Sequence, residues 1–222
     1  MIDWDKVYAT HTPDALPWGG EVVELFEKEK DFLRPYLKTG PRKRILDYGF
    51  GTGSLMKHMK TYGHKVYGAE NSIVAIEQYL DIENSSIFWK YMKMALNTRI
   101  AHVEYPSALR HAFPKFDLIT CIGVLHHINP VLYSHFIEGF GDIMRDDAKL
   151  IVAGWDKADN FIKEPDAKSK VTSKPVYCIN SLEKPVARPD MRITDSATIG
   201  FYDDMFYKMD RLMRIYVMEK NK

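Results

Sequence analysis

Residues 45–53 constrain the fold of this 222-residue chain more than any other segment. They read Ile-Leu-Asp-Tyr-Gly-Phe-Gly-Thr-Gly, an apolar run followed by three alternating glycines. Glycine is needed where the backbone takes a positive φ or where a ligand contacts the main chain. The segment therefore predicts a buried strand that ends in a glycine turn, enters a helix and holds a nucleoside.

Two features of this turn argue against a dinucleotide site. A dinucleotide turn has a third glycine at the position where this chain has Ser54. Asp47 stands two residues before the first glycine, so it places a negative charge near the ligand. That charge suits a cation better than a pyrophosphate. A dehydrogenase is therefore our third-ranked interpretation.

A second strand is predicted over residues 65–70, ending at Glu70 and followed by a helix that Ser72 caps. An acid roughly 20 residues beyond a glycine turn, at the tip of the adjacent strand, is where ribose hydroxyls are bound in such sheets. Residues 116–128 read as a further strand and the segment leaving it, residues 136–145 as a helix, and residues 148–155 as the next strand. This alternation predicts a parallel sheet with helices on both faces and a ligand at the carboxyl ends of the strands.

Residues 40–156 resemble the class I S-adenosylmethionine-dependent methyltransferases in three motifs that occur in the expected order. The pattern D-x-G-x-G-x-G resembles motif I of that family, and the acid after the second strand and the segment 116–128 resemble two later motifs. The resemblance implies an α/β, Rossmann-like, doubly wound, mostly parallel seven-stranded sheet whose last strand is antiparallel. It also implies S-adenosylmethionine as the cofactor. The predicted cofactor-binding residues are Asp47, Gly49, Gly51, Gly53, Glu70 (ribose), Asn71 (adenine), Glu104 (adenine amino group, with Ser107 as the alternative) and Ile122.

We predict a single domain over residues 1–222, in four parts. They are a helical lid or edge segment (1–38), the cofactor-binding core (40–156), a late loop insertion that shapes the substrate pocket (157–200) and a closing helix or strand (201–222). An amphipathic helix is predicted over 21–37, where Pro35 interrupts it. Another helix is predicted between residues 81 and 99, before a strand at 100–103.

Methyl transfer needs alignment more than it needs catalytic side chains. A general base is required only if the acceptor must lose a proton, and His126 or His127, just beyond the fourth strand, could serve, with His126 as the predicted candidate. A purely structural role for His126, hydrogen-bonded beneath the pocket, is the favoured alternative. No histidine pair with a neighbouring acid has metal-ligand spacing, so we predict no metal.

The N-terminal segment is loosely similar to the lead-in of thiopurine- and tellurite-resistance-type methyltransferases, which folds over the active site. This similarity implies that Tyr8 and Trp18 belong to a lid, where aromatic rings exclude water and attract a sulfonium. Ordinary packing of these rings against an edge helix is an equally weighted alternative. Trp155, at the end of the fifth strand, is predicted to form a wall of the substrate pocket.

Composition agrees with this interpretation and narrows the partners. With 31 Lys and Arg against 30 Asp and Glu, the formal net charge of +1 gives no global field for nucleic acid or membranes. Two cysteines are too few for a disulfide framework, and no apolar stretch is long enough to cross a membrane. We therefore expect a cytoplasmic protein that does not bind membranes, and nucleic acid as an unlikely partner.

The predicted function is methyl transfer from S-adenosylmethionine to an oxygen, nitrogen or sulfur atom of a small molecule. The residues after the fourth strand, Cys121 to Val124, lack the Pro-Pro motif of enzymes that methylate base amines. A protein or RNA ribose acceptor remains open as an alternative. So does a non-catalytic nucleoside-binding or partner subunit of the same fold.

Overall fold

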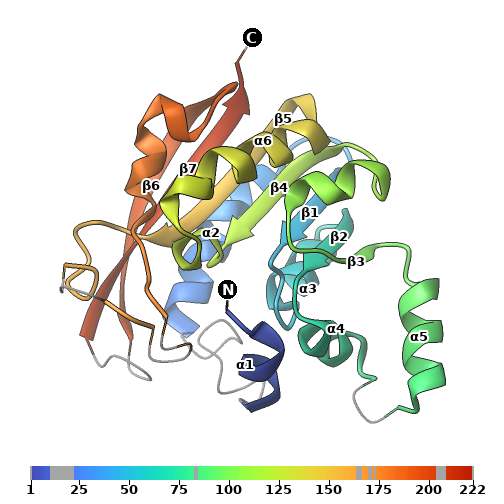
Figure 1. Cartoon of the computed structure of the whole chain (residues 1–222). Coiled ribbons are helices and arrows are strands. Elements are labelled where there is room, and N and C mark those ends of the chain that lie inside the picture. The colour runs from blue at the N-terminus through green and yellow to red at the C-terminus, as the bar shows by residue number, and fades with distance from the viewer. Residues whose placement is uncertain are drawn as a thin grey trace.

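A computed structural model of the chain describes residues 2–10, 23–82, 85–163, 167–169, 172, 174–203 and 209–221. Its centre is a seven-stranded sheet with the strand order β3-β2-β1-β4-β5-β7-β6 (Figure 1). The strands are β1 (Arg44–Tyr48), β2 (Lys65–Glu70), β3 (Ile100–His102), β4 (Phe116–Ile122), β5 (Met144–Trp155), β6 (Met191–Asp203) and β7 (Met209–Lys220). The six α-helices of the described residues are α1 (Trp4–Thr10), α2 (Val23–Lys38), α3 (Ser54–Thr61), α4 (Ile73–Leu80), α5 (Ile87–Leu96) and α6 (Tyr133–Ile143).

The first five strands of the sheet run parallel. β1 pairs with β2 and β4, β2 pairs with β3, and β4 pairs with β5, all in the parallel direction. β7 is antiparallel to both β5 and β6. The predicted Rossmann-like sheet with an antiparallel last strand is therefore confirmed, and the carboxyl ends of β1, β2, β4 and β5 meet along one edge.

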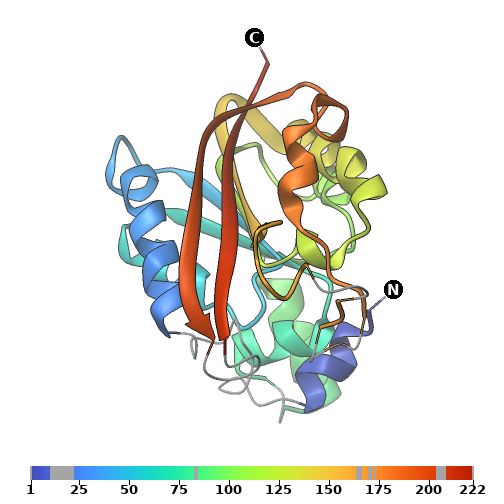
Figure 2. The same cartoon turned by 90° about the vertical axis from the view of Figure 1, so that its left-hand side faces the viewer.

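Successive residues of the central strands point to opposite faces of the sheet, and each face has its own core. In β1, Ile45 packs with Leu33 of α2 and Met56 of α3, whereas Leu46 packs on the other face with Phe140 of α6. Figure 2 shows α2 on one side of the sheet and α6 on the other. Alternation in fully buried strands thus accounts for helices on both faces.

One local prediction is reproduced and one is corrected. The hydroxyl oxygen of Ser72 accepts a hydrogen bond from the Ala75 amide at 3.1 Å, so Ser72 caps α4 as predicted. Pro35, however, does not interrupt α2, which continues to Lys38. Pro35 removes a single backbone donor, and the buried side chains of Leu33 and Leu37 hold the last turn against the sheet.

The C-terminal third differs most from the sequence-based expectation. Residues 191–200, predicted to belong to a loop insertion, form most of β6, an edge strand. In the part of residues 201–222 that the structure describes, the chain forms the end of β6 and then β7, without a helix. Residues 144 and 145, predicted to end a helix, are the first residues of β5.

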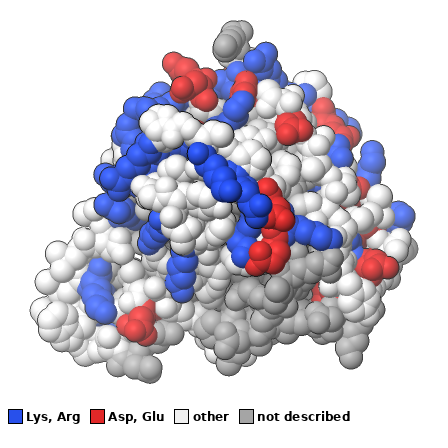
Figure 3. All heavy atoms as spheres, turned by 180° about the vertical axis from the view of Figure 1, so that it is seen from behind, with Lys and Arg blue, Asp and Glu red and all other residues white. Residues whose placement is uncertain are grey.

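Helix α5 projects from the body of the molecule (Figure 1). Its apolar side chains are unusually exposed, with Ile87 at 74%, Trp89 at 59% and Leu96 at 72%. In the opposite view of Figure 3, this lobe is at the lower left and carries few charged side chains. None of the helices that the structure describes is long and apolar enough to span a bilayer.

Candidate functional site

The glycine turn between β1 and α3 has the conformation that its sequence predicts. Gly49, Gly51 and Gly53 have φ values of 72°, 55° and 80°, all in the left-handed region. The Gly49 amide donates to the Ala69 carbonyl at 2.7 Å, which ties the turn to β2. Gly53 then precedes the first residue of α3. The turn is therefore fixed by backbone geometry that other residues rarely adopt.

Two of these glycines also make room for a neighbouring side chain. A Cβ atom on Gly49 would lie 2.2 Å from Cγ2 of Val124, which follows β4. A Cβ atom on Gly53 would lie 2.2 Å from Cδ2 of the Tyr79 ring in α4. The turn is thus packed closely between the β4 loop and α4, and its position depends on the absence of side chains.

Glu70, at the tip of β2, organises the backbone around the turn. One carboxylate oxygen accepts from the Gly51 amide at 2.8 Å, and the other accepts from the Asn71 and Ser72 amides at 2.8 and 3.1 Å. Burial raises the pKa of Glu70, and these three hydrogen bonds oppose the rise. A carboxylate has about four acceptor sites, so one remains for a ligand hydroxyl.

Asp47 lies at the end of β1 and is only 3% exposed. Its Oδ1 accepts from the Thr120 hydroxyl at 2.7 Å, while its Oδ2 has no hydrogen-bond partner among the described residues. Burial raises the pKa of Asp47 to about 7, against the Thr120 hydrogen bond, and the charge of Glu70 adds to the rise. The unpartnered oxygen marks a place for a hydrogen-bond donor or a cation.

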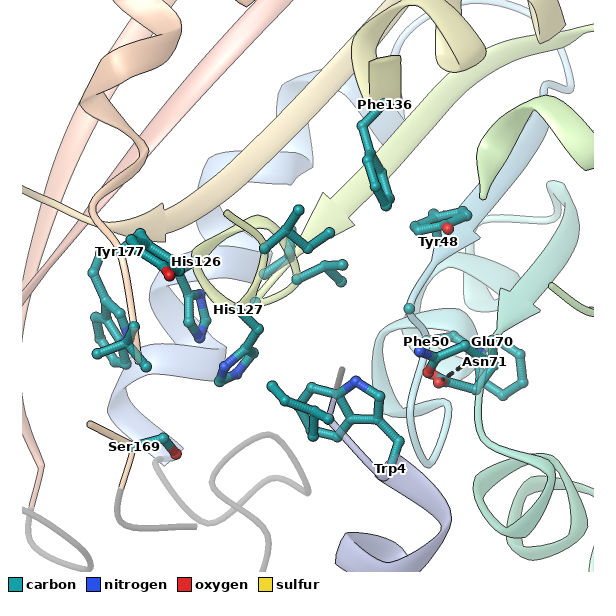
Figure 4. A pocket seen from close by; sticks show the side chains of 18 of the residues that line it. Trp4, Tyr48, Phe50, Glu70, Asn71, His126, His127, Phe136, Ser169 and Tyr177 are labelled. Carbon is teal, nitrogen blue, oxygen red and sulfur yellow. Dashed lines mark hydrogen bonds between the residues drawn. The ribbon is translucent and has the colours of Figure 1, made fainter. Parts of the chain in front are cut away.

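A cavity of about 500 Å³ runs along the carboxyl ends of the strands. Figure 4 shows its two ends, with Trp4 between them. We call them the glycine-turn end, formed by Asp47, Gly49, Phe50, Glu70, Asn71 and Glu104, and the histidine end, formed by His126, His127, Trp155, Val176, Tyr177 and Phe201. The cavity therefore joins the predicted nucleoside site to a second, mostly aromatic compartment.

The structure brings most of the predicted binding residues to the glycine-turn end. Asn71, Glu104 and Ile122 line the cavity, as do Asp47, Gly49 and Glu70. The carbonyl of Glu104 also accepts a hydrogen bond from the Tyr48 hydroxyl at 2.7 Å, which fixes that loop. Gly51 and Gly53 do not line the cavity. They shape the turn instead. The Gly51 amide donates to Glu70, and Gly53 directly precedes the first residue of α3.

His126 lies at the histidine end, on a short turn after β4. Its ring lies 4.0 Å from the His127 ring and 5.2 Å from the Trp155 ring, centroid to centroid. Nδ1 is buried and has no hydrogen-bond partner among the described residues. Burial, followed by the charges of His127 and Arg211, holds the pKa of His126 well below its usual value. Burial likewise lowers the pKa of His127 to about 3, so both rings are neutral at physiological pH.

Trp155, at the end of β5, is held by contacts with an aromatic ring and a guanidinium group. Its ring stacks on Phe201 of β6 at 6.1 Å, and the Arg211 guanidinium carbon lies 3.9 Å from the ring centroid. Arg211 is itself fully buried and bonds to Asp159 through Nε at 2.9 Å. Trp155 is therefore a rigid element of the cavity wall, where the sequence predicts a pocket wall.

Helix α1 forms one wall of the cavity. Trp4 meets the His127 ring edge-on at 5.0 Å, and Tyr8 also lines the cavity. Asp5 fastens the helix, because its Oδ1 accepts from the Ser72 hydroxyl at 2.8 Å and from the Val74 amide at 3.3 Å. Tyr8 is thus at the cavity, whereas Trp18, the other predicted lid residue, lies outside the described residues.

Glu29 and Tyr177 also line the cavity, although neither is among the residues predicted from the sequence. Glu29 projects from α2 and is 8% exposed. A signal for it was present, because Glu29 follows Leu25 and Phe26 at helical spacing and precedes Phe32 on the same apolar stripe. No comparable signal marks Tyr177, whose amide donates to the His126 carbonyl across 51 residues of sequence at 2.8 Å.

The cavity lining is acidic. Among the described residues it contains five acids, Glu29, Asp47, Glu70, Glu104 and Asp203, and one basic side chain, the exposed Lys174. The surface in Figure 3 instead shows basic side chains interspersed with acidic ones. No cluster of three potential metal ligands occurs in the part of the chain that the structure describes. The lining therefore favours a cationic or neutral ligand.

A family model described as a methyltransferase domain matches residues 21–185 of the chain. The chain belongs to this family. An uncharacterized protein of Methanocaldococcus jannaschii is 29% identical to this chain over 144 residues. The aligned residues cover 64% of this chain and 49% of that protein. The chain therefore spans about half the length of that relative.

Solved structures of this methyltransferase family share the fold. A methyltransferase from Anabaena variabilis, described as dependent on S-adenosylmethionine, superimposes with a TM-score of 0.70 at 13% identity, over 98% of this chain and 93% of that one. A magnesium protoporphyrin IX methyltransferase from Synechocystis, solved with bound S-adenosylmethionine, gives 0.59 at 15% identity over 98% and 89%. The predicted class I family and its fold are confirmed.

Proposed function

We propose that this protein is an S-adenosylmethionine-dependent methyltransferase that methylates an oxygen, nitrogen or sulfur atom of a small molecule. The observation that carries the proposal is the single cavity that joins Asp47 and Glu70 to His126 and Trp155. Its volume of about 500 Å³ lies within the range of small-molecule sites. The wall formed by α1 favours a small acceptor over a folded macromolecule.

The residues present fit this cofactor. Glu70 has acceptor capacity left for the ribose, and the unpartnered Oδ2 of Asp47 suits a cationic group. An excess of acids over bases in the lining matches a ligand that carries a sulfonium and an ammonium group. Among the described lining residues, the exposed Lys174 is the one lysine or arginine side chain available to pair with a pyrophosphate, which counts against a dinucleotide.

When bound, S-adenosylmethionine supplies an electrophilic methyl group on a positively charged sulfur. The task of the chain is to hold the acceptor in line with that group, and alignment is worth up to about 7–11 kcal/mol. Trp4, Trp155 and Tyr177 supply flat apolar surfaces that orient the acceptor and exclude water. His126 is neutral and can take a proton from a hydroxyl or thiol acceptor.

Calorimetric titration of the purified protein with S-adenosylmethionine, S-adenosylhomocysteine and NAD tests the proposal. We expect micromolar binding of the two adenosyl compounds and none of NAD. Acceptors would then be screened, small aromatic and heterocyclic molecules first. Binding of NAD alone would revive the dehydrogenase interpretation, and binding of none of the three would contradict the proposed function.

A further inference from the structure

Two carboxyl side chains from distant parts of the sequence line the same cavity. Glu29 comes from α2 and Asp47 from the end of β1, and they are 8% and 3% exposed. Glu29 makes no hydrogen bond or ion pair with any residue that the structure describes. Oδ2 of Asp47 also lacks a hydrogen-bond partner there. The pair is therefore buried and incompletely satisfied.

Among the residues that the structure describes, no lysine or arginine forms an ion pair with either carboxyl group. The other acidic and basic side chains of the described lining are Glu70 from β2, Glu104 after β3, Asp203 from β6, His126 and His127 from the turn after β4, and the exposed Lys174. On α3, His58 interacts with the charges of Glu27, Lys30 and Arg34 of α2. Both cavity histidines are neutral, and Asp203 is paired with Arg211 at 3.9 Å. Two buried carboxyl groups without a cation retain a proton.

The pKa values agree with this geometry. Burial, and then the charge of Asp47, raises the pKa of Glu29 to about 8. Since the pKa of Asp47 is itself raised to about 7, the two groups titrate as a pair near neutral pH. A positive charge placed beside the pair would lower both pKa values, because it stabilises both ionised forms.

We propose that Glu29 and Asp47 form a proton-exchanging cation site, which holds a proton in the free protein and releases it to solvent when the cationic cofactor binds. This inference rests on the proposed function. S-adenosylmethionine carries one positive charge more than S-adenosylhomocysteine, whose sulfur is neutral. The pair therefore favours the methyl donor over the spent product, and the preference increases with pH because release of a proton accompanies binding.

Calorimetry at pH 7.5 in phosphate and in Tris tests the proposal, because the two buffers differ in ionisation enthalpy. The difference in apparent binding enthalpy counts the protons released. We expect roughly half a proton to one proton per S-adenosylmethionine bound to the wild type, and fewer for S-adenosylhomocysteine. In Glu29→Gln, we expect release to fall by at least about half while binding persists.

Two further variants keep the test decisive. Glu138→Gln removes a carboxylate from the exposed face of α6 and should release protons like the wild type. Thr120→Val removes the hydrogen bond that lowers the pKa of Asp47, so the pH of maximal release should rise, even if Glu29→Gln does not fold. The cofactor's own amino group exchanges protons in all variants, so the difference between variants is diagnostic.

Two results would overturn the proposal. One is binding of S-adenosylmethionine to the wild type with the same enthalpy in both buffers. The other is equal proton release by the wild type and Glu29→Gln. Either would leave the proposed function intact, whereas absence of binding of both adenosyl compounds would contradict the proposed function as well.

Discussion

The two ends of the cavity are built in different ways. The glycine-turn end is made by short, local segments, since Asp47, Gly49 and Gly51 lie within five residues and Glu70 bonds back to the turn. The histidine end is assembled from the turn after β4, residues 176–177 and strands β5 and β6. The comparison indicates that the glycine-turn end, proposed to bind the cofactor, is fixed by one local segment. The histidine end, proposed to bind the acceptor, can change one segment at a time.

The sharpest test of the fixed end is Gly49→Ala. The added Cβ atom would lie 2.2 Å from Val124, at a φ of 72° that alanine rarely adopts, so we expect cofactor affinity to fall by about 100-fold or more. Titration calorimetry measures the loss. Gly63→Ala is the matched control, because Gly63 also has a positive φ of 78° but has no atom within 4 Å of its Cβ position. Equal losses of affinity in the two variants would show that packing at Gly49 is unimportant.

His126→Asn tests whether the histidine end acts separately. If His126 is the base, turnover should fall by about 100-fold while cofactor affinity changes by less than about threefold. The pKa of His126 is lowered, so the acidic limb of the wild-type profile of kcat/KM against pH should lie below pH 6.5 and be absent from the variant. A proportionate loss of turnover and cofactor binding would instead make His126 structural.

Glu70→Ala should weaken cofactor binding by more than about tenfold, since the ribose loses a charge-assisted contact of about 1.5–3 kcal/mol. The variant also leaves three amide donors of the turn without their carboxylate, so its Tm should fall. Calorimetry and thermal unfolding measure the two effects. Unchanged affinity would contradict the ribose assignment, and Glu138→Ala, on the exposed face of α6, is the control.

The smallest expected effect concerns stability and pH. The pKa of Glu29 rises from 4.5 to about 8 on folding, so the free folded protein keeps a proton that the unfolded chain loses. Its contribution to stability is complete below pH 4.5 and decreases up to about pH 8, by at most roughly 1.4 kcal/mol per pH unit.

We therefore expect the Tm of the free protein to decrease between about pH 6.5 and 8, and to decrease less in Glu29→Gln. The lowered pKa values of His126 and His127 act in the opposite direction, but only below their usual pKa of 6.5. Thermal unfolding at several pH values distinguishes the two contributions. Parallel curves for the wild type and Glu29→Gln would contradict the burial of a protonated Glu29.

The features that the sequence predicted well are those that neighbouring residues determine. β2 and the Ser72 cap follow from a short apolar run and one hydroxyl, and both appear at the predicted residues. β6 was missed because its apolar alternation is interrupted at Asp195, in a polar stretch from Thr194 to Ser196 that an edge strand tolerates. Glu29 was missed because its significance comes from Asp47, which a sequence pattern does not place beside it.

The hydrogen bonds between Asp5 of α1 and the start of α4 oppose any movement of α1 away from the cavity. If α1 moves away, the Ser72 hydroxyl and the Val74 amide lose their acceptor, at a cost of about 1 kcal/mol each. The Ser72 amide also donates to Glu70. Ser72 therefore contacts both the helix that covers the cavity and the carboxylate proposed to hold the ribose. We therefore expect movement of α1, which would admit an acceptor, to be coupled to release of the cofactor.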